Sequence, residues 1–149
     1  MAIARGAGTE IIRSAHFEDV DNSAETIIFG VQHHIYTVLS IIIKAQTIQA
    51  AGNYCAIQLI GYDATAGTSA QTIQIAQQNM QSLETFVWDN KFSFNGHEPT
   101  DFAGPMDSIV KQDAIADQGS SVAQKLQVNT AHVDDAFEVH VTYIDQNNA

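Results

Sequence analysis

Apolar and polar residues alternate with a period of two along most of this chain, and this pattern constrains the fold more than any other feature. The segment 137–143, FEVHVTY, shows it most clearly, because its odd-numbered residues are apolar or aromatic and its even-numbered residues are polar. Successive side chains of a β-strand point to opposite faces, so such a segment buries one face and exposes the other. The pattern predicts an all-β protein.

Similar segments, rich in Ile, Val, Thr and aromatic residues, are separated by turn residues. We expect strands at 10–17, 25–31, 34–45, 53–62, 71–77, 84–88, 91–95, 123–130 and 136–145. Their spacing and short turns favour an antiparallel two-sheet β-sandwich of the jelly-roll type. Asp89 and Asn90 tolerate the left-handed backbone that a two-residue hairpin turn requires, so they predict such a turn between the two strands that flank them.

The length of 149 residues predicts a single domain, 1–149. Its start, 1–9, consists mainly of small residues and is expected to be a flexible N-terminal arm. The alternation also stops over 96–121, which contains both prolines and is expected to be a long loop excursion.

A short helix is expected inside that excursion. Asp107 is in a position to cap it, and the helix would run through Ile109, Val110 and Ile115 and end before Gly119. One domain with a long excursion between two late strands is therefore the expected organisation.

The charge balance limits the classes of partner. Lys and Arg total 6 against 17 Asp and Glu, which gives a formal net charge of −11. Binding to nucleic acid or to anionic lipid depends on cationic side chains, so neither nucleic acid nor a membrane is expected as a partner. Charged residues make up 15% of the chain, below the roughly 25% that is usual, and a lightly charged polar surface suits contacts with other proteins.

Sequence motifs for catalysis or ligand binding are not found. There is no G-x-S-x-G elbow, no phosphate loop and no zinc-ligand spacing, and the acidic segment 18–23 lacks the glycine and glutamate of an EF-hand. We interpret that segment as a solvated acidic turn. Catalytic residues, cofactors and metal ligands are therefore not expected, and the chain is not expected to be an enzyme.

The remaining histidines and the single cysteine have structural interpretations. His33 and His34 are adjacent and would face opposite sides of a strand, whereas His132 and His140 are expected on exposed strand faces or at an interface. Cys55 lies within an expected strand and is interpreted as a small buried apolar residue. With one cysteine and no secretory start, we expect synthesis in a reducing cytoplasm.

The segment 35–43 is apolar on both faces of its expected strand. Strict alternation places Ile35, Leu39, Ile41 and Ile43 on one side and Tyr36, Val38 and Ile42 on the other. Because a sandwich strand normally exposes one face, either loop residues or another subunit should cover the second face. We expect a homo-oligomer, most simply a trimer, with Tyr36, Val38 or Ile42 at the subunit contact. Arg5, one of few cations, is expected to contact a partner from the arm.

The order of several segments resembles small β-sandwich virion proteins of tailed bacteriophages. The segments are HIYTVLSIII, NYCAIQLIGYDA, SLETFVW, DNKFSF and AFEVHVTYI. The resemblance implies a non-enzymatic virion component, most simply a capsid decoration (cement) protein. Such a protein is assembled in the host cytoplasm, lies on the capsid exterior and contacts the major capsid protein or other virion proteins.

Two alternatives remain at this point. A tail or neck subunit would use the same sandwich. A carbohydrate-binding or receptor-binding module would need exposed aromatic side chains, and the candidates are Tyr36, Tyr54, Tyr62, Trp88 and Phe102.

Overall fold

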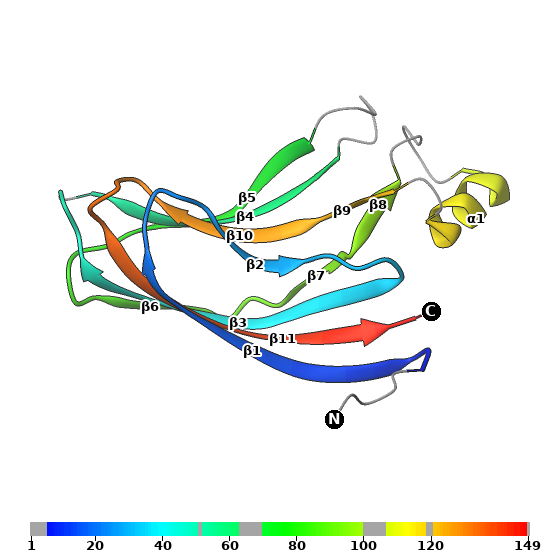
Figure 1. The fold of residues 1–149 in the computed structure, drawn as a ribbon, viewed down its shortest axis with the longest axis horizontal. Helices are drawn as coiled ribbons and strands as arrows, with labels where there is room; N and C mark the ends of the chain where they lie inside the picture. Colours follow the sequence, from blue (N-terminus) through cyan, green and yellow to red (C-terminus); the bar gives the residue numbers. More distant parts are fainter. Residues whose placement is uncertain (1–5, 51, 63–69, 100–106, 119–120, 149) are drawn as a thin grey trace.

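The fold was determined as a computed structural model, which describes residues 6–50, 52–62, 70–99, 107–118 and 121–148. Two antiparallel sheets face each other as the layers of a β-sandwich (Figure 1). The prediction of an all-β antiparallel sandwich is therefore confirmed.

The first sheet has the order β1-β11-β3, and two short strands follow along the free edge of β3. Its strands are β1 (Thr9–Val20), β11 (Ala136–Asn147), β3 (His34–Thr47), β6 (Thr85–Trp88) and β7 (Phe92–Asn95). The second sheet comprises, in order, β2 (Glu25–Phe29), β10 (Lys125–Thr130), β4 (Tyr54–Tyr62) and β5 (Ala70–Asn79). When β6 and β7 are taken as one edge strand, this order is that of an eight-stranded jelly roll.

The hairpin predicted at Asp89 and Asn90 is wrong. Both β6 and β7 pair antiparallel with β3, one beside Ile41 and the other beside Val38, so the chain keeps its direction between them. Neither Asp89 nor Asn90 has the left-handed backbone of a two-residue hairpin turn. The physical reason is the length of β3, whose 14 residues offer an edge long enough for both short strands.

A β-bulge interrupts β3 near its middle. Thr142 of β11 faces Ser40, but the next residue, Tyr143, faces Val38, so Leu39 is an extra residue without a partner in this pairing. An extra residue reverses the alternation, so side chains that follow it point to the face opposite to the expected one.

Because of this bulge, the two faces predicted for the strand are wrong. Tyr36 and Val38 point into the sandwich before it, and Ile41 and Ile43 point into the sandwich after it, with all four side chains at most 3% exposed. Ile42 lies on the outer face and is 38% exposed. The strand appears apolar on both sides in the sequence because its inward-facing residues change parity at Leu39.

The core fills the space between the two sheets. Its largest fully buried side chains are Phe137, Ile41, Ile43, Ile57, Leu126, Val20, Val38, Val128, Val139, Val141 and Cys55. Burial of each large aliphatic side chain contributes roughly 1.5–3 kcal/mol, so this layer is the main source of stability. The interpretation of Cys55 as a small buried residue is confirmed.

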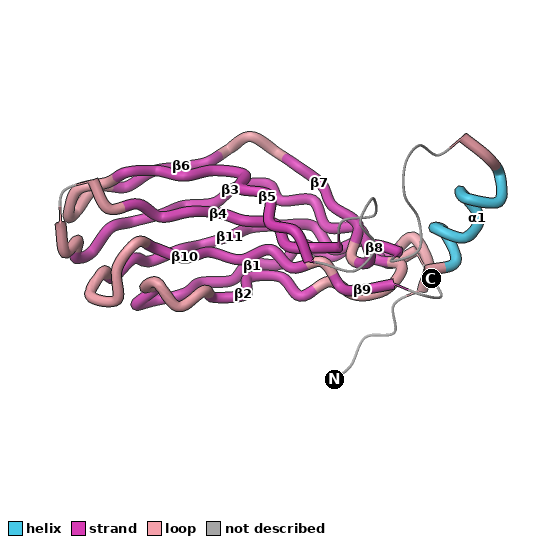
Figure 2. Tube along the Cα trace, turned by 90° about the horizontal axis from the view of Figure 1, so that it is seen from above, coloured by secondary structure: helices cyan, strands magenta, loops and turns pink. Residues whose placement is uncertain are grey.

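The excursion after β7 contains more regular structure than predicted. β8 (His97–Pro99) pairs with β9 (Ser121–Ala123), and helix α1 (Ile109–Asp117) extends beyond one end of the sandwich (Figures 1 and 2). The expected helix is thus confirmed, whereas the two short strands were missed because three residues are too few for alternation to be recognised. Among the described residues, no helix is both long and apolar enough to cross a membrane.

The predicted cap of this helix is corrected. The Ser108 carbonyl oxygen accepts a hydrogen bond from the Gln112 amide at 3.2 Å, and the Ser108 hydroxyl accepts one from the Lys111 amide at 3.3 Å, so Ser108 is the N-cap. Asp107 instead forms an ion pair with the Lys111 ammonium at 2.7 Å.

The end of the expected arm belongs to the first sheet. Thr9 is the first residue of β1 and pairs with Asn147, and the Gly8 amide donates a hydrogen bond to the Asn147 carbonyl oxygen. The part of the arm before Gly6, including Arg5, lies outside the described residues.

Candidate binding face on the outer side of the first sheet

The outer face of the first sheet, directed away from the second sheet, carries a row of side chains that spans four strands. His16 of β1 faces His140 of β11, which faces Ile42 of β3, which faces Val87 of β6. Ile42 is 38% and Val87 53% exposed. An imidazole pair and an exposed aliphatic pair therefore lie next to each other on a rigid sheet.

A small hollow lies over part of this row. Its volume is about 160 Å³, and its lining residues are His16, Ile42, Lys44, Thr85, Glu138 and His140. Pockets for small organic ligands usually measure roughly 300–1,000 Å³. The size of the hollow suits a side chain or an ion better than a metabolite.

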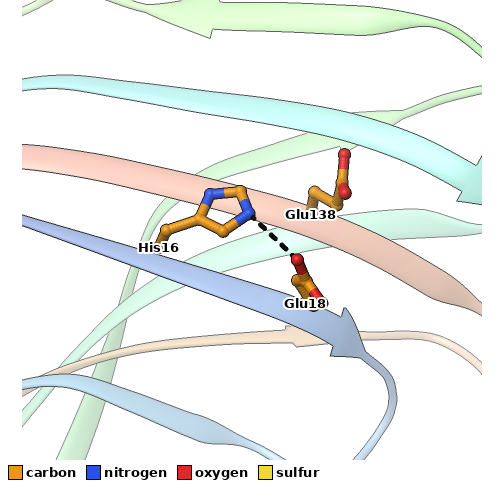
Figure 3. A group of neighbouring side chains, drawn as sticks. All are labelled: His16, Glu18 and Glu138. Carbon is orange, nitrogen blue, oxygen red and sulfur yellow. Dashed lines mark ion pairs between the residues drawn. The ribbon is translucent and has the colours of Figure 1, made fainter.

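Three metal-ligating side chains meet at one side of the hollow. The ligand atoms of His16, Glu18 and Glu138 all lie within 4.8 Å of one another, and His16 Nε2 is 3.9 Å from Glu18 Oε1 (Figure 3). The ring of His140 lies beside them, with its centre 5.9 Å from that of His16. The cluster comes from two neighbouring strands, β1 and β11.

Local backbone geometry brings the two carboxylates together. The register of β1 and β11 shifts between Phe17 and Val20, so Glu18 and Asp19 together face the single residue Glu138. Asp19 adopts a left-handed backbone with φ of 55°. This second bulge places Glu18 beside Glu138. It also corrects the predicted acidic turn, because Glu18 and Asp19 belong to the end of β1.

Sequence reasoning missed this cluster because its members come from opposite ends of the chain. The signal that was available is local: β1 contains His-Phe-Glu at 16–18, and β11 contains Glu-Val-His at 138–140. Each pair is spaced two residues apart and so shares one face of its strand. Only the antiparallel pairing of β1 with β11 joins the two pairs.

The other histidines lie elsewhere. His132 lies in the turn before β11 and not on a strand face, which was one of the two positions predicted for it, and His140 lies on the outer face of β11. His34 begins β3, whereas His33 lies in the preceding turn with φ of 62°. His97 is in β8, where burial lowers its pKa from the usual value.

The predicted interface residues lie in different environments. Tyr36 stacks on Phe94 with ring centres 5.4 Å apart, and its hydroxyl accepts a hydrogen bond from the Val31 amide at 3.2 Å. Tyr36 and Val38 are therefore enclosed within this chain, and a second subunit would not reach them without opening the sandwich. Ile42 is on the outer face, and Arg5 lies outside the described residues.

The predicted sugar-stacking residues do not form an exposed platform among the described residues. Tyr36 is buried, Trp88 packs against the core and Tyr54 is half-buried. The side chain of Tyr62 and the whole of Phe102 lie outside the described part.

A second polar cluster lies between β1, β3 and β11 on the inner side of the first sheet. The Asp145 carboxylate, 5% exposed, contacts His34 Nδ1 at 2.7 Å and Arg13 Nε at 3.4 Å. Burial raises the pKa of Tyr36 to about 12, and the Asp145 charge adds to the rise. Burial also raises the pKa of Tyr143. This cluster balances a buried charge and is structural in character.

Comparisons with known proteins find similarity in structure only. No protein-family model and no curated protein matches the sequence. Among solved structures, a chain from the disulfide-linked pili of Bacillus endospore appendages is 9% identical with a TM-score of 0.43, over 100% of this chain and 97% of that chain. A chain from infectious bursal disease virus, Gx strain, is 8% identical with a TM-score of 0.48, over 99% of this chain and 35% of that chain.

A chain from tomato aspermy virus is more distant, at 11% identity and a TM-score of 0.26, over 99% of this chain and 81% of that chain. The present chain spans about a third of the length of the bursal disease virus chains that it matches. These likenesses are limited to the arrangement of strands.

Proposed function

We propose that this chain is a non-enzymatic structural protein of a bacteriophage virion, and that it acts as a capsid decoration protein. The observation that carries the proposal is the set of exposed aliphatic side chains, including the neighbours Ile42 and Val87, on the outer face of the first jelly-roll sheet. Jelly rolls serve as virion building blocks and also as lectins, so the fold by itself does not select the function.

Exposed aliphatic residues occur in cross-strand sets on the outer face. Ile42 of β3 faces His140 of β11 on one side and Val87 of β6 on the other. Ile12 of β1, which is 71% exposed, faces Ile144 of β11. Grouped apolar side chains on a monomer's surface mark contacts with other proteins more often than scattered ones do. We assign this face to contact with the major capsid protein or with further copies of the chain.

The charge of the protein suits the exterior of a particle. With a formal net charge of −11, it is repelled by packaged nucleic acid and stays soluble before assembly. A protein that binds only the closed shell stabilises that shell by mass action, so no catalytic step is needed. We propose a trimer with Ile42 at or near the subunit contact.

The test uses purified chain and particles that lack it. We expect Ile42→Asp to abolish binding to the particles, because a charge would be buried in the contact. Ile73→Asp is the matched control, since Ile73 is 62% exposed but lies on β5 of the second sheet. If the two variants bound the particles equally well or equally poorly, the outer face of the first sheet would not be the contact surface.

Copy number separates decoration from the alternative of a tail or neck subunit. A decoration protein occupies the whole capsid lattice, whereas a neck or tail subunit forms one or a few rings. Gel densitometry of intact particles, calibrated on the major capsid protein, measures this ratio. A copy number typical of a single ring would replace the decoration role with the neck or tail role.

A further inference from the structure

We propose that His16, Glu18 and Glu138 form a binding site for a divalent transition-metal ion of the zinc type on the outer face of the first sheet. Their ligand atoms, one imidazole nitrogen and two carboxylate oxygens, already lie within 4.8 Å of one another (Figure 3). Around a tetrahedral zinc ion such atoms lie roughly 3.3–3.6 Å apart, because each ligand is about 2.0–2.2 Å from the metal. The exposed side chains cover this difference by rotation about their own bonds.

The sheet fixes the positions from which these ligands extend. His16 and Glu18 are two residues apart on β1, and Glu138 is two residues before His140, which faces His16. The bulge at Glu18 and Asp19 brings the second carboxylate opposite Glu138. Backbone pairing therefore brings Glu138 to two ligands, His16 and Glu18, that lie more than a hundred residues before it in the chain.

The electrostatics of the cluster favour a cation. Two carboxylates lie beside one imidazole, and the Asp19 carboxylate is next to Glu18 in the chain. The positively charged group that faces the cluster from β3 is Lys44, the cross-strand partner of Glu138. A bound divalent ion would attract both the Glu18 and the Glu138 carboxylate, and this attraction would outweigh the repulsion between the two carboxylates.

The types of ligand point to a transition metal rather than to calcium or magnesium. Calcium and magnesium prefer six or more oxygen ligands, whereas an imidazole together with carboxylates suits zinc, cobalt, nickel or copper. Three protein ligands leave the metal one coordination position for water or for a donor group of a bound partner. This site does not depend on the virion role, because it uses groups of one chain alone.

The experiment is a calorimetric titration of the full-length chain with ZnCl₂ in a buffer that does not bind zinc. We expect one equivalent of Zn²⁺ to bind, and no heat from Ca²⁺ or Mg²⁺ at the same concentrations. Loss of an outer-shell partner weakens metal affinity by roughly 10- to 100-fold, so loss of a direct ligand in His16→Ala or Glu138→Gln should weaken it by about 100-fold or more.

The matched control is His132→Ala. His132 forms a similar exposed pair with Asp134, with Nδ1 3.6 Å from Oδ2, but belongs to no three-ligand cluster among the described residues. This variant should bind zinc as the unchanged chain does. No binding by the unchanged chain, or equal affinity in His16→Ala, Glu138→Gln and His132→Ala, would overturn the site.

A second measurement keeps the test valid if one variant folds poorly. Because the ligands converge only in the native state, Zn²⁺ should raise the thermal midpoint of the unchanged chain, and this rise should disappear in Glu18→Gln. Glu18 is exposed, so its substitution leaves the core intact. An equal rise in both proteins would contradict the site and would leave the particle-binding test unaffected.

Discussion

A Cβ atom on Gly30 would lie 1.9 Å from the carbonyl oxygen of Gly96, so these two residues meet backbone to backbone. Gly30 follows β2, Gly96 lies between β7 and β8, and Gln124, which contacts both, lies between β9 and β10. The Gly30 amide donates to the Gln124 carbonyl at 2.8 Å, and the Gln124 amide donates to the Gly96 carbonyl at 2.9 Å. No side chain fits between backbones that approach this closely.

Gly30→Ala and Gly96→Ala should therefore each lower the free energy of unfolding by about 2 kcal/mol or more, because the new methyl group displaces backbone that carries these hydrogen bonds. Gly6→Ala is the control, since nothing lies within 4 Å of its Cβ position. Urea denaturation measures the free energy of unfolding of all three variants. A change at Gly30 as small as that at Gly6 would contradict the close contact.

The bulge at Leu39 makes a prediction about two adjacent residues. Ile41 is fully buried and Ile42 is 38% exposed. Ile41→Ala should cost roughly 2–5 kcal/mol of stability, as other large-to-small core substitutions do, whereas Ile42→Ala should cost less than about 1 kcal/mol.

Chemical denaturation of both variants under the same conditions tests this pair. Each is the other's control, because the two residues are chemically identical and differ only in the face that they occupy. A larger loss in Ile42→Ala than in Ile41→Ala, measured on the monomeric chain, would place Ile42 in the core, as strict alternation from Val38 without a bulge would do.

The pattern of alternation was sufficient to predict the strands of the jelly roll but not the faces of β3. Period-two spacing locates a strand because half of its residues must be buried. A bulge adds one residue without changing composition, so the shift at Leu39 cannot be read from HIYTVLSIII. The direction of the chain after Asp89 depends on the free edge of β3, which is a tertiary feature.

The candidate metal cluster was beyond sequence reasoning for a related reason. His16 and Glu138 become neighbours only through the register of β1 with β11, and a single-residue slip would turn one of them to the other face. Metal motifs that can be found in a sequence have their ligands close together in the chain. Here each strand supplies only a His and a Glu two residues apart, which is a weak signal alone.

The buried thiol of Cys55 should make stability depend on alkaline pH. Burial raises the pKa of Cys55 from 9.0 to about 12. Above pH 9 the unfolded chain loses this proton while the folded chain keeps it, so the unfolded state binds fewer protons and stability falls as pH rises. Well below pH 9 the thiol is protonated in both the folded and the unfolded state, so it adds no pH dependence to the free energy of unfolding.

Urea denaturation at pH 8, 9 and 10 measures this effect. We expect the free energy of unfolding to fall between pH 9 and pH 10 and to fall less steeply in Cys55→Ala. In this window the effect of the thiol exceeds that of Tyr36, whose pKa rises from 10.0 to about 12 mainly through burial and whose own effect becomes large only as the pH passes 10. Equal slopes in both proteins would show that the thiol is accessible in the folded state.

Asp145 should be a sensitive charged position, because its carboxylate is 5% exposed and contacts both His34 and Arg13. Asp145→Asn keeps the shape but removes the charge, which leaves the Arg13 guanidinium without its anion and weakens the contact with His34 Nδ1. We expect a loss of roughly 2–3 kcal/mol, below the roughly 3–5 kcal/mol for a broken, fully buried pair, because Arg13 is 47% exposed.

The same substitution should lower the pKa of Tyr36. Burial is the main cause that raises this pKa to about 12, and the Asp145 charge is the next. Ultraviolet titration of the tyrosines should therefore show an earlier transition in Asp145→Asn, while Asp134→Asn, which removes an exposed carboxylate beside His132, should change neither stability nor titration. If both variants titrated like the unchanged chain, the charge of Asp145 would not be felt at Tyr36, and the buried cluster would be held by packing alone.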